Sequence, residues 1–308
     1  MRKLKKSIFR THLKYIFEVL HTLRQINQHT AVLILSYNNS KLLINLLEDL
    51  IKQEGCSIRI YILDNNSRDE HLKSLKGYLA SLNVEVTLHC SVVNLGFGRG
   101  VNKLFAMYRE DILKCRFCAL VNQDCILNNV NMSGLIETLI IEKLSLVSPV
   151  FNDLNNEVDQ EFERISNVVK QYNHYSLVDF TPAAFWILST KTFEEFDGFD
   201  ERFFMYGEDK NFCDRLIAKG NIIAVSNEHT VIHPFKRGYK KEIEKGYILS
   251  LLLHPTYSLI YKLKVISLRI VRGLFSKRFI DYIEFFLSVF YIFLKSVYSY
   301  NASSKVIR

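Results

Sequence analysis

A few acidic and imidazole side chains in this sequence have neighbours that suit them for chemistry. The adjacent pair Glu208 and Asp209 follows a glycine, and apolar residues then recur at helical spacing. Carboxylates at a helix start are stabilised by the free N–H groups there, so the pair taken in isolation is explained first by a capping role. We expect the aromatic residues Phe203, Phe204 and Tyr206 to form a rigid shelf before the pair. A carboxylate held so at the mouth of a pocket can act as a general base, and the pair Glu208 and Asp209 is the candidate.

Two further residues could hold a divalent cation. Asp124 ends an apolar run, and one carboxylate together with substrate phosphate oxygens is a usual way to hold Mg²⁺ or Mn²⁺. His233 follows the strand-like run 222–226 and precedes Pro234, where it could be a second metal ligand or contact a diphosphate. The alternatives are a turn aspartate and a structural histidine.

The elements that must position these residues alternate along the chain. Short apolar runs predict buried strands, and apolar residues at helical spacing follow them. The strands are expected at 31–35, 58–63, 84–88 and 117–121, with a glycine-bearing loop at 96–102. This alternation predicts an α/β fold with a Rossmann-like, mostly parallel sheet and helices on both faces.

Polar residues gather where these strands end. In parallel α/β sheets, ligands bind beyond the carboxyl ends of the strands. Each residue alone could be turn chemistry, but their joint placement predicts a ligand site. Asp64 is suited to accept hydrogen bonds from a base or ribose, and the glycines of the loop let the backbone approach a ligand. The candidates for nucleotide binding are Tyr37, Asn38, Asp64, Asn66, Asn94, Gly96 and Asn102.

The charge is uneven along the 308 residues, whose net charge is +8. Residues 1–30 contain seven Lys or Arg against one acid, and residues 230–308 contain fourteen against four. Bulky apolar side chains alternate with these basic ones, which favours a membrane surface over nucleic acid as the anionic partner. We therefore expect no nucleic-acid partner, an amphipathic N-terminal helix at 1–28, a catalytic domain at 29–245 and a membrane-associated helical region at 246–308.

No apolar run reaches the roughly 18 residues that a spanning helix needs, and no signal peptide is recognisable. These features predict a cytoplasmic protein that lies on the inner face of the cell membrane without crossing it.

Several short motifs in this order resemble the family-2 inverting glycosyltransferases, especially the bacterial rhamnosyltransferase-like members that build surface polysaccharides such as O-antigen. The resemblance covers about residues 30–240, and its strongest part is the segment 198–209, GFDERFFMYGED. The other matching motifs are Ser36-Tyr37-Asn38, Asp64-Asn65-Asn66-Ser67, Asn94-Leu95-Gly96-Phe97-Gly98 with Asn102, Leu120-Val121-Asn122-Gln123-Asp124, and His233.

The resemblance implies a GT-A type fold, a nucleotide-diphosphate sugar donor such as dTDP-rhamnose or a UDP-hexose, and a lipid-linked or oligosaccharide acceptor. It assigns Asp64 to the nucleotide, Asp124 to a Mg²⁺ or Mn²⁺ ion and Asp209 to the catalytic base. It also implies that Phe185 and Trp186, with Tyr206 nearby, line the acceptor or sugar pocket. In one departure, Asn122 stands where the family's metal motif often has its first aspartate.

Two other functions compete with this interpretation. A sugar-nucleotide nucleotidyltransferase would use the same crevice, but it usually has a basic, glycine-rich loop early in the chain, and residues 36–40 do not form one. A non-catalytic scaffold on the membrane surface would explain the basic ends without any chemistry.

Overall fold

The computed structural model describes residues 29–82, 84–233, 240–274, 287 and 290–291. The predicted helix at 1–28 and most of the tail beyond residue 274 lie outside these described residues.

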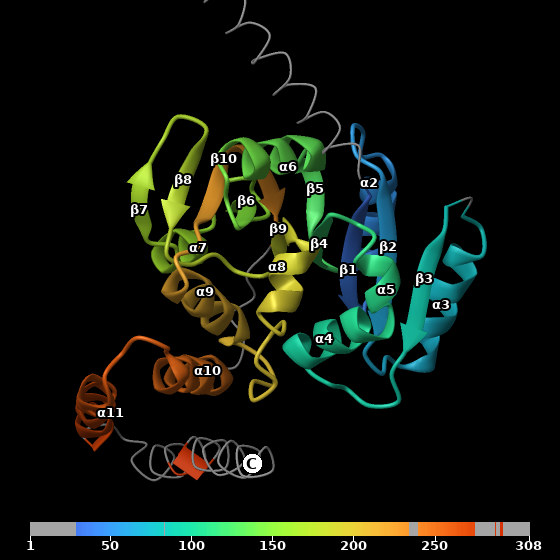
Figure 1. The fold of residues 1–308 in the computed structure, drawn as a ribbon. Coiled ribbons are helices and arrows are strands. Elements are labelled where there is room, and N and C mark those ends of the chain that lie inside the picture. Colours follow the sequence, from blue (N-terminus) through green and yellow to red (C-terminus); the bar gives the residue numbers. More distant parts are fainter. Residues whose placement is uncertain (1–28, 83, 234–239, 275–286, 288–289, 292–308) are drawn as a thin grey trace, which may run out of the picture.

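The described strands form one sheet with the order β3-β2-β1-β4-β9-β6-β10-β8-β7, and β5 pairs with β10 (Figure 1). The strands are β1 (Thr30–Ser36), β2 (Ile58–Asp64), β3 (Val86–Cys90), β4 (Phe117–Asn122), β5 (Ile126–Asn129), β6 (Leu146–Asn152), β7 (Val168–Gln171), β8 (Tyr175–Val178), β9 (Phe185–Ser189) and β10 (Ile223–Ile232).

Helices flank this sheet, which confirms the predicted α/β fold class (Figure 1). They are α2 (Ser40–Ile51), α3 (Asp69–Leu79), α4 (Phe97–Met107), α5 (Arg109–Ile112), α6 (Met132–Ile141), α7 (Gln160–Ile165), α8 (Thr190–Glu195), α9 (Glu208–Ala218), α10 (Lys240–Leu253) and α11 (Leu259–Leu274).

The sheet is parallel on one side and mixed on the other. β3, β2, β1 and β4 are parallel neighbours, as the alternation of strands and helices predicts. β9 then runs antiparallel between β4 and β6. β1 lies between β2 and β4, so the strand order reverses here. Such a reversal opens a crevice at the carboxyl ends of the strands, where ligands bind in open α/β sheets.

Apolar spacing accounts for the packing of the first helix. Leu43, Leu46, Leu47 and Leu50 recur at helical spacing in α2, and all four are buried. The side chain of Asn39 accepts a hydrogen bond from the Leu42 backbone N–H and caps the start of the helix.

Two sequence expectations need correction. The predicted strand 84–88 lies two residues later, as β3. The predicted loop 96–102 is mostly helix, because α4 begins at Phe97. A Cβ on Gly98 would lie 2.9 Å from the Phe199 Cβ, and one on Gly100 would lie 2.5 Å from the Leu35 Cδ1, which is closer than side chains approach. These two glycines therefore let α4 pack closely on its neighbours, and Gly96 caps the start of the helix.

The predicted domain boundary at 245/246 falls inside α10. This helix buries Ile248, Leu249, Leu251 and Leu252 and packs against α9, while α11 projects away from the sheet (Figure 1). No helix among the described residues is long and apolar enough to cross a membrane.

Candidate active site

A cavity of about 200 Å³ opens at the point where the strand order reverses. Its walls come from the ends of β1, β2 and β4, from the start of α4 and from the loop before α9. The lining residues are Leu35, Tyr37, Asn65, Asn94, Gly96, Phe97, Asn122, Gln123, Asp124 and Met205. The structure thus brings Tyr37, Asn94, Gly96 and Asp124 together at one cavity.

Three of the predicted nucleotide-binding residues hold the turns behind this cavity. The Asp64 carboxylate accepts a hydrogen bond from the Ser67 backbone N–H at 3.0 Å. The Asn38 side chain accepts one from the Arg68 backbone N–H at 2.8 Å. Asn38 and Asn66 both have positive φ, at 49° and 67°, which asparagine tolerates better than most residues. None of the three lines the cavity. The hydrogen bonds of Asp64 and Asn38 fix two strand-end turns, and Asn66 lies exposed in the turn after β2.

Asn65 connects two walls of the cavity, and sequence reasoning had given it no role. Its side-chain amide donates to the Asn94 carbonyl oxygen Oδ1 at 3.0 Å and to the Gly96 backbone carbonyl at 3.3 Å. Its Oδ1 accepts from the Leu95 backbone N–H at 2.8 Å. Asn65 is 2% exposed, so these bonds form in a site largely closed to water. The position of Asn65 directly after a buried strand is the sequence feature that could have identified it as a site residue.

Gln123 connects the ends of β1 and β4 in the same way. Its Nε2 donates to the Tyr37 backbone carbonyl at 3.0 Å, and its Oε1 accepts from the Tyr37 N–H at 3.0 Å. This pair of bonds fixes the loop that carries Tyr37, whose side chain remains exposed at the cavity.

Asp124 and His233 meet beside the cavity. The His233 Nε2 lies 3.3 Å from the Asp124 Oδ1 and 3.3 Å from the Asn122 Nδ2. The backbone N–H of His233 donates to the Asn152 carbonyl at 3.0 Å, and its ring meets the Phe151 ring edge-on. A carboxylate oxygen and an imidazole nitrogen this close can bind one cation. No group of three or more His, Cys, Asp or Glu residues forms a metal site within the described part of the chain.

The acid pair begins α9, as predicted, after Gly207, which caps the helix in a left-handed conformation at φ 92°. Glu208 is 5% exposed, and burial together with the charge of Asp209 raises its pKa to about 8. Burial also raises the pKa of Asp209, against the hydrogen bonds that its carboxylate accepts from the backbone N–H groups of Lys210 at 2.7 Å and Ala183 at 3.4 Å. A carboxylate with a raised pKa and oriented oxygens is suited to take a proton.

The loop that leads into the acid pair packs on the wall of the cavity. The Phe97 N–H donates to the Phe204 carbonyl at 3.1 Å, and any Cβ on Gly96 would overlap that carbonyl. Met205 of the same loop lines the cavity, whereas Glu208 and Asp209 lie outside its lining. The acid pair therefore adjoins the cavity through the segment 204–207.

Asn102 fixes the other end of this loop. Its Nδ2 donates to the Phe199 carbonyl at 2.8 Å, and its Oδ1 accepts from the Phe199 N–H at 2.9 Å. The structure thus gives Asn102 a link between α4 and the segment before α9. It places no part of Asn102 in the cavity lining.

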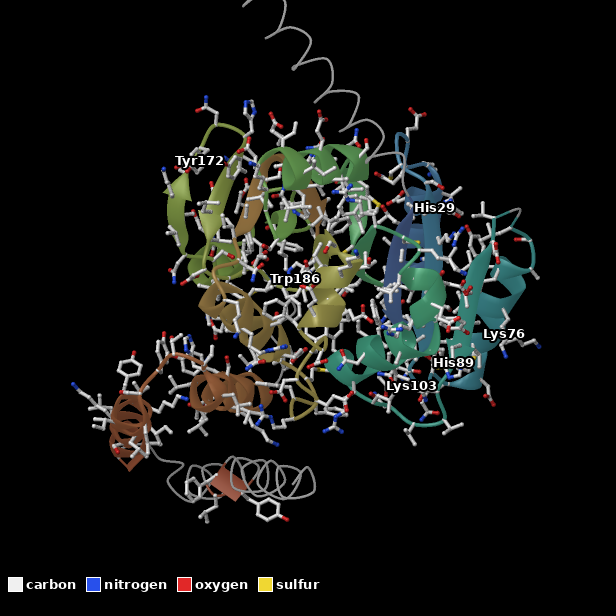
Figure 2. The ribbon with its side chains drawn as sticks, in the orientation of Figure 1. His29, Lys76, His89, Lys103, Tyr172 and Trp186 are labelled. Carbon is white, nitrogen blue, oxygen red and sulfur yellow. The ribbon has the colours of Figure 1, made fainter. Side chains whose placement is uncertain are left out.

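Phe185 and Trp186 lie in the core, away from the cavity. Both are 0% exposed, and Trp186 packs against Phe199 and Phe212 with ring centroids 5.9 and 5.7 Å apart. Figure 2 shows Trp186 in the interior of the molecule. The Trp186 ring lies beneath α9, where it supports the helix. Successive side chains of a strand point to opposite faces of the sheet, so the Phe185 ring is buried on the other face of β9. Tyr206 is half-buried at the turn before the acid pair, at φ 66°.

Part of this chain is similar in sequence to a known protein family. The family model described as glycosyl transferase family 2 matches residues 31–197, more than half of the chain. A comparison with curated proteins gave no match.

Solved structures of similar fold show how such a sheet is used elsewhere. One is a mannosyltransferase from Pyrobaculum calidifontis in complex with GDP-Man and Mn²⁺, at 12% identity and TM-score 0.56, covering 74% of this chain and 63% of that one. GalNAc-T7 with UDP, GalNAc and Mn²⁺ matches at 13% identity and TM-score 0.56, covering 73% and 48%. A portion of S. aureus TarS in complex with UDP matches at 19% identity and TM-score 0.54, covering 76% and 68%.

The match thus spans less than two thirds of the length of the first two proteins. At these identities the likeness shows the fold, which is the GT-A fold of these glycosyltransferases.

Proposed function

We propose that this chain, which belongs to glycosyl transferase family 2, is an inverting glycosyltransferase that moves a sugar from a nucleotide-diphosphate donor to an acceptor hydroxyl. The observation that carries the proposal is the cavity at the strand-order reversal. Its walls combine amide side chains with apolar and aromatic ones, one side holds the Asp124–His233 pair, and the loop of the acid pair adjoins the other.

The donor is expected to lie across the ends of β1, β2 and β4. Exposed Tyr37 offers an aromatic face to a nucleobase, and Asn65 with Asn94 keeps the neighbouring wall in place. The similar structures hold GDP-Man, UDP or UDP-GlcNAc, and we extend to this chain a donor of that chemical class, such as a UDP-hexose or dTDP-rhamnose.

The residues at the cavity fit a divalent cation. Asp124 and His233 would supply one oxygen and one nitrogen ligand, and diphosphate oxygens or water would complete the shell. When bound, Mn²⁺ or Mg²⁺ would offset the charge on the departing diphosphate. His233 takes this role because it reaches Asp124 from the end of β10. Asn122 stands where a second carboxylate ligand could have been, so His233 is the second ligand instead.

Asp209 is the proposed base. Its carboxylate takes the proton from the acceptor hydroxyl while that oxygen forms the new bond to the anomeric carbon. The bond from the anomeric carbon to the diphosphate oxygen breaks with its electron pair on the diphosphate, and one displacement inverts the centre. Burial and the charge of Asp209 raise the pKa of Glu208, which favours a protonated Glu208 beside an ionised Asp209.

The acceptor is proposed to be a lipid-linked or oligosaccharide substrate of bacterial surface polysaccharide synthesis, used at the cytoplasmic face of the cell membrane. Support comes from α11, which is amphipathic in composition and contains Lys262, Lys264, Arg269 and Arg272 without any acidic residue. Its exposed apolar side chains include Leu259, Leu263, Leu268 and Ile260, the last 81% exposed. Each basic residue near an anionic surface contributes about 1 kcal/mol.

A donor panel tests the proposed activity. Purified protein is mixed with UDP-, GDP- and dTDP-sugars with and without Mn²⁺, and binding and release of the nucleoside diphosphate are measured. We expect one nucleotide class to bind more tightly with Mn²⁺ and to be slowly hydrolysed. Release of pyrophosphate from a nucleoside triphosphate and a sugar phosphate would instead identify a nucleotidyltransferase, and binding of no nucleotide would contradict the proposal.

Vesicle binding tests the membrane partner. We expect co-sedimentation with anionic vesicles, weaker binding to neutral ones, and a loss of binding in Ile260→Glu. The matched control is Ile141→Glu, because Ile141 is also exposed but ends α6 rather than lying on α11. Equal binding of both variants would contradict a role for α11.

A further inference from the structure

α10 meets the turn before the acid pair with its backbone. Any Cβ on Gly246 would overlap the Tyr206 carbonyl, and a Cβ on Gly207 would lie 2.7 Å from the Gly246 carbonyl oxygen. Gly207 caps α9, and both Tyr206 and Gly207 have positive φ. The position of α10 is thus tied to the start of α9, where Glu208 and Asp209 lie.

A second contact joins α10 and α9 at Asp214, more than one helical turn after the acid pair. The His254 Nε2 at the end of α10 lies 3.4 Å from the Asp214 carboxylate of α9. Asp214 is buried and also forms an ion pair with Lys210, the residue that follows Asp209. The His254 ring stacks on the Tyr257 ring with centroids 3.5 Å apart and an interplanar angle of 3°.

α11 holds His254 in turn. The Lys262 ammonium donates to the Leu252 and His254 backbone carbonyls, both at 2.8 Å, and so caps the end of α10. A continuous set of contacts therefore runs from α11 through His254 and Asp214 to Lys210, beside the proposed base.

We propose that Gly246 and His254 are positioning residues for Asp209, so that the α10–α11 pair is a working part of the active site. The inference rests on the proposed role of Asp209 as base. The family match ends at residue 197, so both the acid pair and its support lie beyond the matched segment. Because the donor cavity is lined by residues of other loops and by Met205, these positioning residues act on turnover more than on donor binding.

Gly246→Ala in the full chain tests the proposal, with Gly77→Ala as the matched control. Both glycines lie in helices, but a Cβ on Gly77 meets nothing within 4 Å. We expect Gly246→Ala to lower kcat by about tenfold to a hundredfold, as a small displacement of a catalytic group does, with the donor KM changed less than twofold. Amide hydrogen exchange in 204–212 should rise in Gly246→Ala and stay at the wild-type level in the control Gly77→Ala.

His254 supplies an independent pair of variants, which decides the matter if Gly246→Ala does not fold. His254→Ala should lower kcat and raise exchange in 204–212, and His254→Gln, which can still donate to Asp214, should restore part of both.

Exchange and kcat that match the Gly77→Ala control, or equal effects of His254→Ala and His254→Gln, would overturn the inference. A wild-type chain with no transferase activity would refute the proposed function instead, and the exchange comparison would still decide the structural coupling.

Discussion

Asn65→Ala removes three hydrogen bonds that hold one wall of the donor cavity. The Asn65 side chain joins Asn94, Leu95 and Gly96 to the end of β2, and it is almost wholly buried. At about 1 kcal/mol for each bond, the variant loses about 3 kcal/mol of stability. A domain of this size then melts at a temperature lower by about 6–12 °C.

The same change should weaken donor binding, because the loop 94–96 must be ordered again when the nucleotide binds. If ordering the loop costs between half and all of the lost energy of about 3 kcal/mol, the binding free energy is weaker by that amount. Nucleotide affinity then falls by about tenfold to a hundredfold. Thermal melting and isothermal titration with the nucleotide identified by the donor panel measure the two effects. Asn155→Ala is the control, since Asn155 is exposed in a turn away from the cavity.

Two results would refute this reasoning. Nucleotide affinity equal to that of the wild type, despite a lower melting temperature, would show that the wall has no part in donor binding. A melting temperature equal to that of Asn155→Ala would show that the three bonds add no stability.

Three further predictions concern Glu208, Asp124 and Asn102. The pKa of Glu208, raised to about 8 from an ordinary 4.5, means that the folded chain retains a proton that the unfolded chain loses, so stability falls as the pH rises between these values. Glu208→Gln should flatten this decline in urea midpoints measured from pH 5 to 8; an unchanged slope would contradict the buried protonated acid. Asp124→Asn should abolish the gain in nucleotide affinity on adding Mn²⁺, and a retained gain would place the cation elsewhere. Asn102→Ala loses two backbone contacts to Phe199, or about 2 kcal/mol, and should lower the melting temperature while leaving nucleotide affinity within about threefold; a large affinity loss would return Asn102 to the donor site.

The first half of the fold could be predicted because local patterns determine it. Buried apolar runs and helical spacing placed β1, β2 and β4 within one residue of their ends, and the alternation of elements indicated parallel pairing. The antiparallel insertion of β9 between β4 and β6 depends on contacts far apart in sequence, which no local pattern contains.

The site was predictable by position but only partly by role. Residues after strand ends did gather, yet Asn38, Asp64 and Asn66 shape turns, while the neighbouring Asn65 and Gln123 hold the cavity walls. Which side chain of a polar turn faces a ligand depends on backbone angles such as positive φ, and these cannot be read from residue type alone.

The aromatic residues and glycines show a second limit. Trp186 looks from sequence like a sugar platform, but its strand is central and its ring fills the space beneath α9. Gly98 and Gly100 look like a ligand loop, but they serve helix packing against Phe199 and Leu35. In each case tertiary packing determined the role.

Asp209→Asn tests the central claim most directly, because the two side chains have nearly the same size and differ in their ability to take a proton. Donor affinity and acceptor-dependent turnover are measured together on the variant and the wild type. The account predicts unchanged donor affinity and turnover lowered by about a hundredfold or more. Turnover equal to that of the wild type would contradict the assignment of Asp209 as the base.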